Sequence, residues 1–88
     1  GDYINMSQDL THAAVQIQDL IEQLQNKGAT AEVAQQQVAM DISTQARDNP
    51  AIRNKLVKWG QSLGDKTVSD VVRSAVKLAI RSAGIPLP

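Results

Sequence analysis

The sequence contains no cysteine, so neither a disulfide framework nor a thiolate metal site can form. Tyr3 and Trp59 are its only aromatic residues, and a hydrophobic core must therefore be built from aliphatic side chains. No apolar run approaches the roughly 20 residues that span a bilayer, and no basic stretch followed by an apolar one marks a signal peptide. These absences favour a small domain with an aliphatic core, and they leave its redox compartment undetermined.

The formal net charge is zero, but the charges are divided unevenly along the 88 residues. Residues 1–46 contain one basic and six acidic side chains, a net charge of −5. Residues 47–88 contain eight basic and three acidic side chains, a net charge of +5. This division favours packing of the two halves on each other, or of the acidic half of one copy on the basic half of another.

Apolar residues recur at helical spacing from residue 10 onward and predict a first helix. Ser7 or Asp9 can cap its beginning, and Gly28 can end it by adopting a left-handed conformation. The apolar stripe of this helix consists of Leu10, Ala13, Ala14, Ile17, Leu20, Ile21 and Leu24.

A second helix is predicted from a Thr30 cap to about Arg47, and it carries two apolar stripes. The main stripe consists of Ala31, Ala34, Val38 and Ile42. A weaker stripe on nearly the opposite side consists of Val33, Gln37, Met40 and Thr44. The second stripe indicates either a deeply buried helix or a contact surface, and the pattern does not choose between them.

Two further helices are predicted in the basic half. Asn49 can cap the third, with Pro50 in its first turn, and Ile52, Leu56, Trp59 and Leu63 form its stripe, although Gly60 weakens its second half. Thr67, with Asp70 three residues on, is the predicted cap of the fourth, which Gly84 and Pro86 end. The chain is therefore predicted to be all-α: one domain, 1–88, folded as a compact bundle of about four antiparallel helices, with an extended lead-in over 1–6 and an apolar tail over 85–88.

Residues 1–64 resemble a helical module that recurs in cyanobacterial multidomain proteins near pentapeptide repeats or signalling NTPase modules. The resemblance is carried by Gly1-Asp2-Tyr3, by LTHAAVQIQDLIEQL from Leu10 to Leu24, and by NPAIRNKLVKWG from Asn49 to Gly60. It weakens afterwards, because the module's double glycine is spread to Gly60 and Gly64 and the fourth helix is basic. The resemblance implies a bacterial, cytoplasmic, accessory module and transfers no catalytic residue.

The residue types that support catalysis or metal binding are few and scattered. His12 is the only imidazole and falls on the polar side of the first helix, which is typical of a solvated residue. Asp19 and Glu22 are one turn apart but have no His or Cys partner that would complete a metal site. No phosphate-binding glycine loop or nucleophile-turn motif occurs. We therefore expect no enzymatic activity, no metal or other cofactor and no small-molecule substrate.

Six residues are candidates for an interface. Val33 and Met40 belong to the second stripe, and Trp59 is interpreted as core, with an interface anchor as the alternative. Arg73, Lys77 and Arg81 form a basic stripe on the fourth helix. That stripe fits a solvated face, an acidic protein partner, or an anionic membrane or nucleic acid. Nucleic acid is disfavoured because stacking aromatics are lacking, and a membrane because the apolar face of this helix uses Val and Ala.

The sequence thus predicts a non-catalytic protein–protein interaction module that forms a homodimer. The alternative is a basic amphipathic C-terminal helix that docks on an anionic membrane or on nucleic acid.

Overall fold

The computed structural model describes residues 4–86, which form four α-helices with no strand among them. The helices are α1 (Leu10–Asn26), α2 (Ala31–Asp48), α3 (Pro50–Gln61) and α4 (Asp70–Ser82). The all-α, four-helix prediction is confirmed. The Gly1-Asp2-Tyr3 element and the last two residues of the apolar tail lie outside the described residues.

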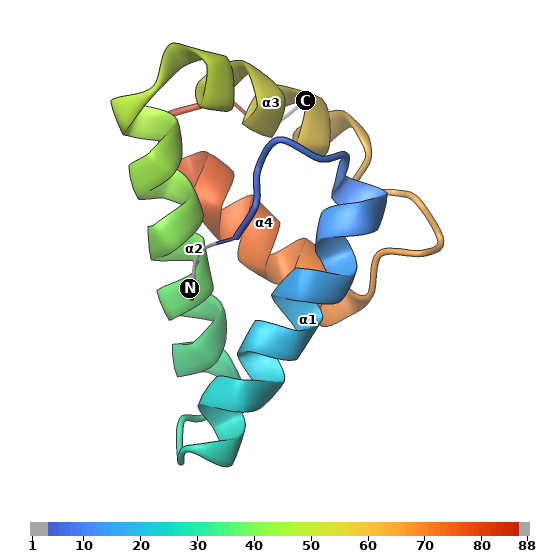
Figure 1. Cartoon of the computed structure of the whole chain (residues 1–88), viewed down its shortest axis with the longest axis vertical. Helices are drawn as coiled ribbons and strands as arrows, with labels where there is room; N and C mark the ends of the chain where they lie inside the picture. The colour runs from blue at the N-terminus through green and yellow to red at the C-terminus, as the bar shows by residue number, and fades with distance from the viewer. Residues whose placement is uncertain (1–3, 87–88) are drawn as a thin grey trace.

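Helices α1 and α2 run antiparallel as a hairpin that splays open away from its turn, as Figure 1 shows. The turn forms where it was predicted, because Gly28 has a φ of 106°. This conformation lets the backbone N–H of Ala29 donate to the carbonyl of Leu24 at 3.0 Å, which closes α1. Thr30 then caps α2, its side chain accepting a bond from the N–H of Val33 at 3.1 Å.

Helix α3 lies across the open end of this hairpin, and α4 runs diagonally behind it (Figure 1). Asn49 caps α3 as predicted, because its side chain accepts a hydrogen bond from the N–H of Ala51 at 2.9 Å. The helix ends at Gln61, so Leu63 lies in the following loop, although its side chain is still buried. A Cβ at Gly60 would lie 3.2 Å from Ile80 Cδ1, so this glycine allows α3 to approach α4 closely.

The predicted beginning of α4 was wrong by two residues. Its cap is Ser69, whose hydroxyl accepts from the N–H of Val72 at 3.3 Å. Thr67 instead donates its N–H and hydroxyl to the Asp65 carboxylate, at 2.9 and 2.7 Å. Val68 therefore lies in the loop with its side chain buried in the core.

The lead-in segment contributes to the core, which the sequence pattern did not indicate. Ile4 and Met6 are almost fully buried, and the segment crosses the opening between α1 and α2 (Figure 1). The N–H of Ile4 donates to the Asp41 carboxylate at 3.1 Å, and the Gln45 side chain donates to the Ile4 carbonyl at 3.0 Å. These bonds satisfy backbone groups that an extended segment otherwise leaves unpaired.

The inner face of α2 differs from its predicted main stripe: Ala31 is exposed, whereas Ala34, Val38 and Ile42 are buried as predicted. Its buried residues extend to small side chains that face α4, and the complete set is Ala34, Val38, Ala39, Ile42, Ser43 and Ala46. The opposing residues of α4 include Ala75 and Ala79, which are also fully buried. Small residues on both helices allow close packing, so α2 is already well covered on this side.

Candidate functional site

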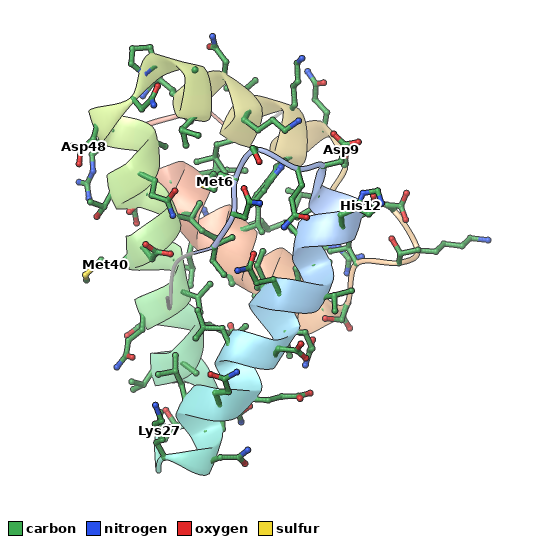
Figure 2. All side chains as sticks on the ribbon, viewed as in Figure 1. Met6, Asp9, His12, Lys27, Met40 and Asp48 are labelled. Carbon is green, nitrogen blue, oxygen red and sulfur yellow. The ribbon has the colours of Figure 1, made fainter. Side chains whose placement is uncertain are left out.

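The outer face of α2 is the candidate interaction surface. Val33, Gln37, Met40 and Thr44 are all exposed, which excludes the deeply buried alternative for the second stripe. The side chain of Met40 is 66% exposed and that of Val33 is 41% exposed. Figure 2 shows Met40 pointing away from the body of the molecule. Within residues 4–86, α2 is the helix with two large exposed hydrophobic residues; α1 and α3 have one each, Val15 and Val57.

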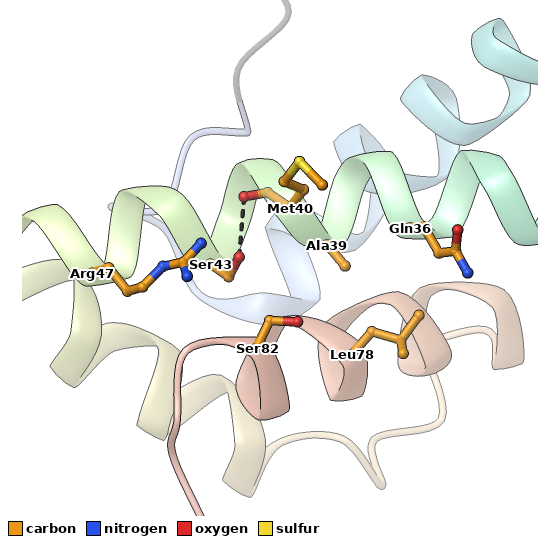
Figure 3. A pocket seen from close by; sticks show the side chains of 7 residues that line it. All are labelled: Gln36, Ala39, Met40, Ser43, Arg47, Leu78 and Ser82. Carbon is orange, nitrogen blue, oxygen red and sulfur yellow. Dashed lines mark hydrogen bonds between the residues drawn. The ribbon is translucent and has the colours of Figure 1, made fainter.

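A groove with a volume of about 360 Å³ lies beside this face, between α2 and α4 (Figure 3). Its lining consists of Gln36, Ala39, Met40, Ser43, Arg47, Leu78 and Ser82. Ala39 and Ser43 are short and buried, and the Ser43 hydroxyl is occupied by a bond to the Met40 carbonyl at 3.1 Å. The groove therefore offers an apolar centre with polar groups at its ends. Sequence periodicity missed this groove because its far wall comes from α4.

The three residues of the predicted basic stripe of α4 differ in their surroundings. The guanidinium of Arg73 donates to the carbonyls of Leu63 at 2.6 Å and Val68 at 2.9 Å. It also pairs with the carboxylate of Asp70 at 2.6 Å. Arg73 thus holds the loop between α3 and α4, whereas Lys77 and Arg81 are exposed.

Trp59 lies in the core, with 1% of its surface exposed. Its indole N–H donates to the carbonyl of Gln8 at 3.0 Å, which ties α3 to the residues just before α1. Burial and a satisfied N–H agree with the core interpretation. They remove Trp59 from the surface that a partner can reach, so it is not an interface anchor in this fold.

The polar residues considered for catalysis or metal binding do not converge. His12, Asp19 and Glu22 are all exposed along α1, and Glu22 accepts a bond from the Gln18 side chain at 3.2 Å. Among the described residues, no three His, Cys, Asp or Glu side chains are close enough to hold a metal ion. The hydrogen bonds from Thr67 hold the pKa of Asp65 below its ordinary value, which reflects the loop geometry.

Comparisons of the chain with protein-family models, curated proteins and solved structures find no match. In the part of the chain that the structure describes, no helix combines the length and apolar character needed to cross a membrane.

Proposed function

We propose that this chain is a non-catalytic helical interaction module of a bacterial accessory protein and that it self-associates as a dimer through the outer face of α2. The main support is that Val33 and Met40 are exposed on a helix whose opposite side packs in the core. Removing these two side chains from water stabilises an association by about 25 cal/mol for each Å² of apolar surface buried. Isolated exposed apolar residues are ordinary, but two on one helix beside an apolar groove favour a contact surface.

The division of charge supports the same proposal. Within residues 4–86 one ion pair joins the acidic and basic halves, between Lys55 and Asp9 at 3.2 Å. The other, between Arg73 and Asp70, lies inside the basic half. Most charges are thus left to steer a second copy rather than to hold one chain together.

Sedimentation equilibrium tests the proposal. We expect the wild-type chain to dimerise at high micromolar concentration and both Val33→Asp and Met40→Asp to shift it to monomer, because each buries a charge in the contact. Val15→Asp is the matched control: it makes the same change on α1, at a valine that is 65% exposed, and should leave the dimer intact. A strictly monomeric wild type would overturn the proposal, and a dimer indifferent to both α2 changes would move the interface elsewhere.

The second candidate function is docking of α4 on an anionic membrane or on nucleic acid. Lys77 and Arg81 are the observation in its favour, but the bonds made by Arg73 leave two exposed cations in place of three. Cosedimentation with anionic vesicles and gel shift with nucleic acid test it. Binding that is lost in a Lys77→Ala, Arg81→Ala double variant would favour this second candidate.

A further inference from the structure

Two residues of opposite charge lie near the two ends of α2, whose last residue is the exposed Asp48. Asp48 falls about 100° from Arg47 around the helix and does not line the groove. Glu32 lies in its first turn and Arg47 in its last, and both are exposed. Neither has an ion-pair partner within residues 4–86. They are separated by about 22 Å along the helix, at 1.5 Å per residue, so they cannot pair with each other. Any pairing between these two positions must therefore involve a second molecule.

Both charges lie on the side of α2 that borders the groove. At 100° per residue, Glu32, Ser43, Gln36 and Arg47 fall within an arc of about 60°, with Met40 next to it. Figure 3 shows Gln36 and Arg47 toward opposite ends of the groove, with Met40 between them along α2. Glu32 is one turn beyond Gln36. Along α2, Arg47 therefore lines one end of the groove, and Glu32 lies one turn beyond its other end.

We infer that the partner at this site is a second copy of the chain, with the two α2 helices antiparallel and Glu32 of each copy facing the partner's Arg47. This inference rests on the proposed function and names the occupant of its surface. The two-fold axis then passes between Ala39 and Met40, midway between the two charged residues. Each Met40 side chain enters the partner's groove, where short Ala39 and Ser43 leave space and Leu78 forms the wall.

Charge complementarity sets this orientation. In the antiparallel pair both ends bring opposite charges together, whereas a parallel pair would place Glu32 against the partner's Glu32 and Arg47 against the partner's Arg47. The apolar contact at Met40 tolerates either direction, because Met is flexible. The repulsion in the parallel arrangement therefore selects the antiparallel one.

A charge-swap series measured by sedimentation equilibrium tests the register. Glu32→Lys and Arg47→Glu should each weaken the dimer by ~10-fold, because each replaces two symmetry-related attractions with two repulsions. The double variant Glu32→Lys, Arg47→Glu should return to within about threefold of wild type, because both contacts are attractive again. Glu22→Lys on α1 and Lys58→Glu in the last turn of α3 are the matched controls and should leave the affinity unchanged.

Helix-dipole effects do not mimic this pattern. Each single change opposes the α2 dipole, and the double variant opposes it at both ends. The thermal stability of the monomer should therefore be lowest in the double variant, whereas the dimer affinity of the double variant should return toward that of wild type. A double variant as weak as the single variants, or single variants that bind like wild type, would overturn the register. If Met40→Asp still abolishes the dimer in that case, the α2 face stands and only the antiparallel pairing fails. A monomeric wild type overturns both.

Discussion

At the scale of single residues, Arg73 was a candidate for binding a partner, but its side chain makes its hydrogen bonds within the chain. The loop between α3 and α4 presents backbone carbonyls that need donors. A guanidinium supplies several donors in one rigid plane, and Arg73 uses them on Leu63, Val68 and Asp70. Its residue type is therefore explained by loop structure, without a ligand.

We expect Arg73→Lys to lower the free energy of unfolding by about 1–2 kcal/mol, because an ammonium on a flexible stem cannot satisfy three separated acceptors and Arg73 is partly exposed. Urea denaturation followed by circular dichroism measures the change. Arg81→Lys is the same substitution on the same helix at an exposed position, and it should cost less than about 0.5 kcal/mol. Equal costs at the two positions would contradict the role given to Arg73.

At the scale of elements, the lead-in segment closes the opening of the α1–α2 hairpin. Its contribution to stability can be measured by comparing the two methionines of the chain. Met6 is 2% exposed in this segment, whereas Met40 is 66% exposed on α2. Met6→Ala should cost about 2–5 kcal/mol of stability, because it leaves a cavity. Met40→Ala should change monomer stability by less than about 0.5 kcal/mol.

The free energies of unfolding of these two Met→Ala variants are compared by denaturation at a protein concentration too low for dimers to form. Sedimentation at high concentration should reverse their order, since only Met40→Ala removes apolar surface from the proposed contact. If Met6→Ala were as mild as Met40→Ala, the lead-in segment would not be part of the core.

Local sequence rules predicted most helix ends, because Thr30, Gly28, Asn49 and Pro50 act through their own backbone neighbours. They failed where tertiary contacts decided between equivalent options. Thr67 and Ser69 are both good caps, but Thr67 is bound to Asp65 and Val68 is drawn into the core, so α4 begins after Ser69.

The candidate site likewise has one part that the sequence predicted and one part that it did not. Periodicity along α2 predicted the outer stripe, since a helix of known register separates its faces. The groove was not predictable, because it depends on where Leu78 and Ser82 of α4 come to lie. The role of Arg73 within the fold was not predictable for a similar reason. Its acceptors, the carbonyls of Leu63 and Val68, belong to a loop, and helical periodicity does not predict the path of a loop.

At the scale of the whole molecule, the radius of gyration of 11.7 Å agrees with the roughly 12 Å expected for a compact monomer of this length. The core is closed by residues of one chain, and in the described part no buried side-chain nitrogen or oxygen lacks a hydrogen-bond partner. The proposed dimer is therefore an addition to a finished fold, and variants that break it should remain helical.

The salt dependence of the dimer separates the two forces proposed to hold it, ion pairing and apolar burial. Exposed ion pairs contribute about 0.2–1 kcal/mol each, so two symmetry-related pairs change Kd by about 2- to 30-fold. The Debye length falls from about 10 Å at 0.1 M to about 3 Å at 1 M, which removes most of that contribution. Sedimentation equilibrium across this range should show Kd rising and then levelling off, because the Met40 and Val33 contact does not depend on screening. Glu32→Gln, Arg47→Gln dimers should begin near the high-salt value and respond little to salt. A wild-type dimer that tightened steadily with salt would show that apolar burial alone holds it, and the charged ends of α2 would then have no part in choosing the partner.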